Sequence, residues 1–242
     1  MNFRPIDIAR KLHVSTSALR NYEAAGLVPP ADRTASGHRT YTELHAAYFE
    51  CIQAMSPGFG MDITAEVLRR LQKGEWASAL WRMTEAQAAL FQDKRRADDT
   101  LAYLESGEAE TAQEAPDPGG QSIGRVSMET GVPRSAIRHW EKAGLITASR
   151  NPANGYRTFS RLQVRKIRLI RTLRQAIYSQ ELAELKKAIG LLDPDNLEAA
   201  KAIARDSLRY LERMNLHQLK GAYCVYRLCE RLNVPLSPIH RE

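Results

Sequence analysis

The residues best suited to binding a ligand are arginines near the start of a short helical segment. Arg134 and Arg138 lie one helical turn apart, directly after Pro133, and proline favours the start of a helix. Around them, residues 122–175 contain 12 basic side chains and two acidic ones. A guanidinium group donates hydrogen bonds in a planar fork, which suits phosphate groups and the edge of guanine. A solvated charged face is the simplest alternative, but this density of positive charge favours a polyanion as the partner.

Other kinds of site lack the residues that they need. The sequence contains no nucleophile–base–acid arrangement, no glycine loop for phosphate and no zinc-ligand spacing. Cys224 and Cys229 are five residues apart, which on a helix turns them ~140° from each other and does not suit a shared thiolate metal site. With Cys51 they make an odd, sparse set that is typical of a reducing compartment. We therefore expect no enzyme activity, no metal and no cofactor.

The composition divides the chain into two halves. The 242 residues carry a formal net charge of +7, and no run approaches the ~20 apolar residues of a membrane-spanning helix. We therefore expect a soluble, cytoplasmic protein that associates with the nucleoid and has no membrane partner. Residues 105–121 contain five acidic side chains, no basic ones and no large apolar ones, a composition typical of a flexible linker. This predicts a first half at 1–104 and a second half at 122–242.

Each half contains one copy of the same small module. A shift of 118 residues overlays residues 14–44 on residues 132–162 without a gap, and 13 of these 31 positions are identical. In each copy a short helix and a turn lead to a second helix, at 16–25 and at 134–143. Ser15 is an expected N-cap, and Gly26 and Gly144 stand where a glycine commonly ends a helix. The order of elements predicts a helix-turn-helix.

A β-hairpin is expected after each helix-turn-helix, at residues 36–41 and 154–159. The pair Asn154-Gly155 is a strong hairpin signal. A hairpin in this place forms a wing, whose basic tip can lie along a phosphate backbone.

The segments 131–146 and 154–159, which read GVPRSAIRHWEKAGLI and NGYRTF, resemble the MerR family of bacterial winged helix-turn-helix regulators. Residues 13–28 with 36–41 resemble the same family a second time. The resemblance implies two DNA-binding modules in one chain. It also implies a mechanism, because members of the family commonly activate transcription by bending and untwisting an overlong promoter spacer, which realigns the promoter for RNA polymerase.

The DNA contacts follow from the place of each side chain in the module. Residues near the start of the second helix reach base edges in the major groove, and these are Thr16, Ser17, Arg134 and Ser135. Residues one turn further on are better placed for phosphate, and these are Arg20, Tyr22, Arg138, His139 and Trp140. The wings add Arg33, His38, Arg39, Arg150, Tyr156 and Arg157. Core packing is an equal alternative for Tyr22 and Trp140, and Glu23 and Glu141 are expected to orient a neighbouring arginine.

More helices are expected after each winged module. The expected pairs are 41–55 with 62–72, and 161–175 with 179–189. The first half then divides into a winged helix at 3–44, helices at 44–73 and a long helix at 75–104. The second divides into a winged helix at 122–162, helices at 161–190, a long helix at 195–232 and a short tail. The predicted fold class is mainly α, with two small β-hairpin wings.

The two long helices show the alternating 4,3 spacing of a two-helix seam. In the first, the seam positions are Trp76, Leu80, Met83, Gln87, Leu90, Lys94, Ala97, Leu101 and Leu104. In the second they are Leu197, Lys201, Ala204, Leu208, Leu211, Asn215, Gln218, Ala222, Val225, Cys229 and Leu232. We expect these helices to pair antiparallel within one chain, which gives a monomeric pseudo-dimer. A homodimer with four winged modules is the alternative.

The expected partner is double-stranded promoter DNA, with RNA polymerase nearby. The leading hypothesis is a sequence-specific transcriptional regulator. An architectural or recombination accessory protein that bends DNA is the main alternative. A third hypothesis is a ligand-sequestering protein whose pocket is lined by Trp76, Trp81 and Tyr223.

Overall fold

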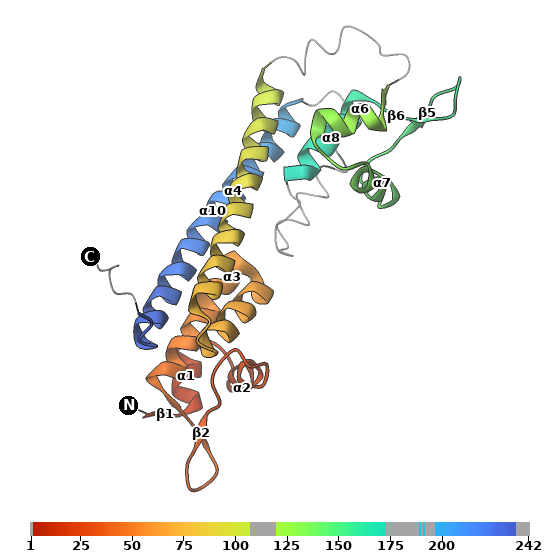
Figure 1. Ribbon diagram of the computed structural model, residues 1–242. Coiled ribbons are helices and arrows are strands. Elements are labelled where there is room, and N and C mark those ends of the chain that lie inside the picture. Colours follow the sequence, from red (N-terminus) through yellow and green to blue (C-terminus); the bar gives the residue numbers. More distant parts are fainter. Residues whose placement is uncertain (1, 107–119, 173–188, 190, 192–196, 236–242) are drawn as a thin grey trace, which may run out of the picture. The chain divides into compact units, whose positions relative to one another are not determined.

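The computed structural model describes residues 2–106, 120–172, 189, 191 and 197–235. They belong to two compact units, which we describe one at a time. Unit 1 is Met1–Ala89 with Arg213–Glu242, and unit 2 is Leu90–Glu212. Each unit holds one winged module and part of each of the helices α4 (Trp76–Glu105) and α10 (Leu197–Arg231) (Figure 1). None of the helices described is long and apolar enough to cross a membrane.

The first module is built from three short strands and two short helices. In chain order these are β1 (Asn2–Phe3), α1 (Pro5–Lys11), α2 (Thr16–Ala24), β2 (Asp32–Arg33) and β3 (Arg39–Thr42). The Ser15 side chain accepts a hydrogen bond from the Ala18 N–H at 3.0 Å, which confirms Ser15 as the N-cap of α2. Just after α2, Gly26 has a φ of 70°, a conformation that glycine adopts without strain.

The second module repeats this construction. Its elements are β4 (Gln121–Ser122), α6 (Ile123–Thr130), α7 (Arg134–Lys142), β5 (Ser149–Arg150) and β6 (Arg157–Phe159). Three fully buried side chains, Ile137, Ile146 and Phe159, occupy the positions that Leu19, Val28 and Tyr41 occupy in the first module. The sequence repeat is therefore a repeat of the same small core.

Two details of the wings differ from the sequence prediction. Each wing belongs to a three-stranded antiparallel sheet, in the order β1-β3-β2 or β4-β6-β5, because a two-residue strand before the first helix adds to the hairpin. The gapless overlay also fails in the wing: Arg33 pairs with Arg39 and Arg150 pairs with Arg157. Arg33 therefore corresponds to Arg150 and not to Asn151, since the second wing has one more residue between its strands.

In unit 1, a long kinked helix connects the winged module to α4 and α10. This helix, α3 (Glu43–Gln72), follows β3 directly, and Gly60, with a φ of 78°, interrupts its helical geometry. The expected helices at 41–55 and 62–72 are thus the two arms of one segment. Buried residues of α3 such as Ile52 share one hydrophobic core with Met83 of α4 and Val225 of α10.

In unit 2, α8 (Arg161–Thr172) takes the corresponding place after β6. Its buried Ile167 shares a core with Leu104 of α4 and Ala204 of α10. An ion pair between Glu105 of α4 and Arg205 of α10, 2.8 Å apart, lies beside this core.

Parts of five sequence predictions fall outside the described residues. These are residues 173–175 of the expected helix at 161–175, the helix at 179–189 except for residue 189, residues 195–196 of the expected long helix at 195–232, the linker at 107–119 and the tail from 236 onward. The two expected ends of the linker belong to regular elements, Glu105 to α4 and Gln121 to β4.

The predicted seam of α4 and α10 is confirmed at some positions and wrong at others. The predicted seam residues that are buried are Met83, Ala97, Leu104, Ala204, Leu211, Gln218, Val225 and Cys229. On α4, Gln87 and Lys94 are exposed, whereas Asp93 and Thr100 are buried. The buried seam residues of α4 are Ala79, Met83, Asp93, Ala97, Thr100 and Leu104. On α10, Ala200, Ser207 and Leu228 are buried next to the expected Lys201, Leu208 and Cys229. Several of the buried seam residues are polar or small. A search for large apolar residues at seam spacing does not find them.

Within unit 1, two glycines allow α3 and α10 to approach closely. A Cβ atom on Gly58 would lie 2.6 Å from the backbone N of Gln218, and a Cβ on Gly221 would lie 3.1 Å from the Cα of Met55. The Gln218 side-chain amide donates a buried hydrogen bond to the Gly58 carbonyl at 3.0 Å. The backbones themselves are thus in contact here.

We expect Gly58→Ala to lower the free energy of unfolding by about 2 kcal/mol, because the added methyl group must push two helices apart. Gly124→Ala in α6 is the matched control. A Cβ there meets only the flexible end of Arg134 and the Ser122 hydroxyl, so we expect an unchanged or slightly higher stability from the better helix former. Urea unfolding followed by circular dichroism measures both. Equal stability of the two variants would contradict the close packing of α3 and α10.

Candidate DNA-binding surface

The recognition helices, α2 and α7, present most of the predicted DNA-contacting side chains to solvent. On α2, Ser17 and Arg20 are exposed, and Thr16 and Tyr22 are half-buried. On α7, Arg134, Ser135, Arg138 and His139 are exposed. Trp140 is only 9% exposed and belongs to the core of unit 2, while Tyr22 packs against the core of unit 1. Core packing therefore explains why Trp140 is buried and why Tyr22 is half-buried.

A glutamate on each recognition helix holds an arginine of the wing. Glu23 accepts a hydrogen bond from Arg39 Nε at 2.9 Å, and Glu141 accepts one from Arg157 Nε at 2.8 Å. The prediction that these glutamates orient a neighbouring arginine is confirmed in both modules. The pairs also connect each wing to its recognition helix, so the two parts of the surface keep a fixed relation.

In the first module this ion pair has two further partners. The Glu23 carboxylate also accepts hydrogen bonds from the Ala31 N–H at 3.3 Å and from the Tyr41 hydroxyl at 3.2 Å. Burial opposes ionisation of Glu23, but the hydrogen bonds from Ala31, Arg39 and Tyr41 outweigh it and hold its pKa below the usual value. Burial, and next the negative charge of Glu23, raises the pKa of Tyr41 to about 12. The carboxylate therefore stays charged and the phenol neutral near pH 7.

Two arginines face each other at the base of each wing. The cross-strand pairs are Arg33 with Arg39 and Arg150 with Arg157, and like charges in such positions destabilise a sheet. The glutamate of the recognition helix neutralises Arg39 or Arg157. Arg33 and Arg150 instead donate hydrogen bonds to the carbonyls of Gly37 and Gly155, at 3.2 and 3.0 Å. Of the residues that the structure describes, no acidic side chain pairs with Arg33 or Arg150, so each wing retains a positive charge in a defined place.

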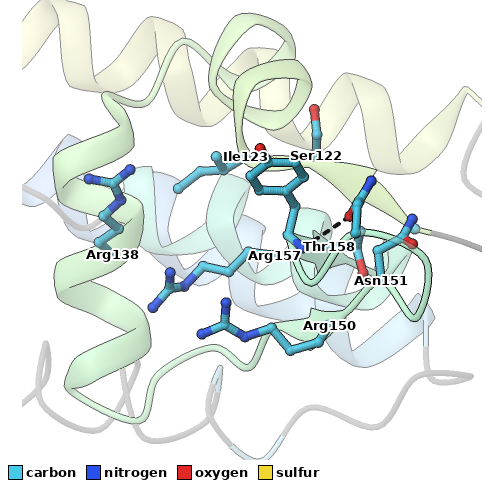
Figure 2. Close-up of a pocket in the computed structure, with 10 residues that line it drawn as sticks. Ser122, Ile123, Arg138, Arg150, Asn151, Arg157 and Thr158 are labelled. Carbon is cyan, nitrogen blue, oxygen red and sulfur yellow. Dashed lines mark hydrogen bonds between the residues drawn. The ribbon is translucent and has the colours of Figure 1, made fainter.

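In the second module, arginines from the recognition helix and the wing line one pocket of about 350 Å³. Figure 2 shows Arg138 from α7 and Arg150 and Arg157 from the wing strands, with their side chains on one side of it. The positive charge of this pocket suits a phosphate group. The exposed Tyr156 also lines it.

The other residues that line the pocket were not predicted from the sequence. They are Gly120, Ser122, Ile123, Asn151, Asn154 and Thr158. Ser122 carried a usable signal, because it stands directly before the first helix and caps it by accepting a hydrogen bond from the Arg125 N–H at 3.3 Å. The others reach the pocket through strand pairing and the longer second wing, which local sequence does not indicate.

Two other kinds of site were considered from the sequence, a metal site and a ligand pocket. Across residues 2–106, 120–172 and 197–235, no group of three or more His, Cys, Asp or Glu side chains is placed to hold a metal ion. Trp81 and Tyr223 are 69% and 59% exposed, so they do not enclose the ligand pocket that was considered for them. The third hypothesis is wrong about these two side chains.

Each unit thus carries a helix-turn-helix and a basic wing joined by an ion pair, the arrangement of a winged helix-turn-helix DNA-binding protein. A family model described as MerR family regulatory protein matches residues 4–41, and one described as MerR HTH family regulatory protein matches residues 121–191.

Proteins that are similar to this chain include transcriptional regulators. The chain is 28% identical over 117 residues to the HTH-type transcriptional regulator CueR of Salmonella typhi, covering 46% of this chain and 85% of that protein. It is 31% identical over 94 residues to the HTH-type transcriptional regulator HmrR of Rhizobium leguminosarum bv. viciae, covering 38% of this chain and 70% of that protein. No solved structure matches the chain significantly. The chain belongs to the MerR family, carries two MerR modules and is a DNA-binding transcriptional regulator.

We expect Glu23→Gln to lower the free energy of unfolding by roughly 1–2 kcal/mol at pH 7, because the charged acceptor of three hydrogen bonds is lost. The pKa of Glu23 is depressed in the folded protein, so its contribution is present above its unfolded pKa and disappears as the pH falls through the folded value. The difference between variant and parent should therefore shrink below about pH 4.

Glu85→Gln is the control for this experiment, because the Glu85 side chain is 71% exposed and its ion pair with Arg82 is 3.7 Å long. We expect this change to stay within about 0.5 kcal/mol of the parent. Urea unfolding between pH 3 and 8 measures all three proteins. A Glu23→Gln variant that matches Glu85→Gln at pH 7 would contradict the role given to the Glu23 cluster.

Proposed function

We propose that this protein is a sequence-specific regulator that binds double-stranded promoter DNA with both winged modules of one chain. The observation that carries the proposal is the matching arrangement at the two wings, Arg33, Arg39 and Glu23 in one and Arg150, Arg157 and Glu141 in the other. Both modules keep a fixed arginine beside an exposed recognition helix. A module that had lost DNA binding would have no need to retain this strained pair of like charges.

The pairing of the long helices within the chain supports a single-chain pseudo-dimer. In unit 1, the first part of α4 shares a core with the last part of α10, and in unit 2 the last part of α4 shares a core with the first part of α10. Each helix thus finds in its own chain the antiparallel partner that a homodimer would take from a second chain. One chain then supplies two modules to one operator.

The two modules are expected to read different half-sites. At the start of the recognition helix, α2 has Thr16 and Ser17 while α7 has Arg134 and Ser135, and only arginine presents the paired donors that suit the edge of guanine. An operator for this protein therefore has no need of a palindrome. Residues 122–175, with 12 basic and two acidic side chains, supply the larger share of the attraction to phosphate.

The regulatory step that we propose is deformation of the promoter. Two modules linked in one chain can hold two DNA segments in a defined relation, and bending or untwisting the DNA between them costs several kcal/mol that the paired contacts must offset. Such a deformation would realign the promoter elements for RNA polymerase, and the protein would act at the nucleoid.

The second candidate function is that of an architectural or recombination accessory protein. The same two modules on one chain favour it, because they can bend any DNA that carries both half-sites. The positions of the binding sites in the chromosome distinguish the two functions. Chromatin immunoprecipitation followed by sequencing should find the binding sites of the protein in promoter spacers. Sites confined to the ends of mobile elements would contradict the regulatory proposal in favour of the accessory role.

We expect Arg138→Ala to weaken DNA binding by roughly 1–3 kcal/mol and to reduce the slope of log K against log salt by about 1, since Arg138 lines the pocket that suits a phosphate. Arg20→Ala, the equivalent change in the less basic first module, should cost less. Fluorescence anisotropy with a duplex selected from a random library measures the affinities at several salt concentrations.

Arg209→Ala on α10 is the charge-matched control, because Arg209 is exposed, pairs with Asp206 on the same helix and belongs to neither winged module. We expect a near-parental affinity for this variant. An Arg138→Ala variant that binds as tightly as Arg209→Ala would remove Arg138 from the DNA interface.

A further inference from the structure

Two cysteines that are far apart in the sequence meet between α3 and α10 of unit 1. Two hydrogen bonds fix the antiparallel register of these helices, from Gln218 to the Gly58 carbonyl at 3.0 Å and from Arg231 to the Glu43 carbonyl at 3.1 Å. Cys51 lies midway between Glu43 and Gly58, and Cys224 lies midway between Gln218 and Arg231. The register therefore places the two cysteines opposite each other.

The separation of the helices suits a bond between these thiols. Close beside them, a Cβ on Gly221 would lie 3.1 Å from Met55 Cα, so the two backbones are nearly in contact. A disulfide needs Cα atoms ~4.4–6.8 Å apart, a range that only closely packed helices provide. All three cysteines of the chain are free thiols in this structure.

The environments of the two sulfur atoms differ in a way that assigns them different roles. Cys51 is buried, whereas Cys224 is partly exposed. Interaction with the Cys51 thiol is the main reason why the pKa of Cys224 falls to about 7, with help from Lys220 and Arg227 and against burial and the charge of Glu50. Interaction with the Cys224 thiol and burial raise the pKa of Cys51. Since the thiolate is the reactive form, Cys224 is the nucleophile of the pair.

We propose that Cys224 is an oxidation site for small hydroperoxides and that Cys51 is the thiol that resolves it to a disulfide. In the first step the Cys224 thiolate attacks one oxygen of the peroxide, the O–O bond breaks, and the sulfenic acid forms with release of hydroxide. In the second step the Cys51 thiol attacks the Cys224 sulfur, an S–S bond forms and water leaves. Two thiols are oxidised by two electrons and the peroxide is reduced by two.

The bond would join α3, which follows the first wing directly at Thr42, to α10. It closes a long loop of the chain, which restricts the unfolded state strongly. The oxidised protein should therefore unfold at a higher urea concentration than the reduced one. Cys229 supplies an internal comparison, because burial raises its pKa and it has no place in the proposed pair.

The test treats the reduced full-length protein with hydrogen peroxide under native conditions, then alkylates the remaining thiols in urea and maps the digest without reduction. We expect a peptide that links Cys51 to Cys224, with Cys229 alkylated. Cys229→Ser should give the same linkage at the same rate. In Cys51→Ser, and equally in Cys51→Ala, the sulfenic acid of Cys224 should persist and react with dimedone.

A second readout is the rate at which iodoacetamide alkylates Cys224 in the native protein as a function of pH. We expect a midpoint near pH 7, and in the Cys51 variants a midpoint closer to that of an ordinary cysteine, about 8.5. Three results would overturn the proposal: a native Cys224 that peroxide leaves unmodified, disulfides that form only between chains or with Cys229, or an alkylation midpoint that is the same with and without Cys51.

Discussion

The packing of α4 against α10 is the interaction on which the rest of the structure depends. These helices have 30 and 35 residues, and helices in water owe most of their stability to the packing of an apolar face. Each unit places part of one against part of the other, and each winged module is attached to the core formed there. Without this pairing, neither module would have a base on which its short helices could pack.

Several residues inside the seam are polar, and each is satisfied within its own helix. Thr100 and Ser207 are buried, and their hydroxyl groups donate to carbonyls one turn back, at 2.8 and 2.9 Å. Asp93 is also buried and pairs with Arg96 at 2.8 Å. Buried polar groups cost free energy unless they are hydrogen-bonded, and these bonds within one helix reduce that cost. The seam can therefore contain polar residues without a polar partner from the facing helix.

Both wings reduce the repulsion between two neighbouring arginines in the same way. Two arginines across a strand pair repel each other, and a glutamate from the recognition helix offsets one of them. The remaining arginine is held by a glycine carbonyl, so its charge points to a fixed place and is not spread over many side-chain conformations. This arrangement favours a ligand with regularly spaced negative charges. The larger basic excess of the second module indicates that this module contributes more to the attraction for such a ligand.

Local patterns in the sequence predicted the two modules. They did not predict the contacts between segments that are distant in the chain. The repeat predicted two copies of one module, and the cap at Ser15 and the ion pairs of Glu23 and Glu141 followed from simple chemistry. The third strands, each two residues long, carry no pattern of their own. The seam was misplaced because Asp93 and Ser207 are polar, and the contact of Cys51 with Cys224 depends on the register of two helices that are distant in the chain.

In the arrangement that we propose, one chain supplies both halves of the DNA-binding unit. Light scattering after size exclusion measures the mass of the protein in solution, free and bound to a selected duplex. We expect a free mass near 27.2 kDa and a complex of one protein with one duplex. A free mass of twice that value, or two protein chains on one duplex, would contradict this arrangement and would mean that the long helices pair between chains.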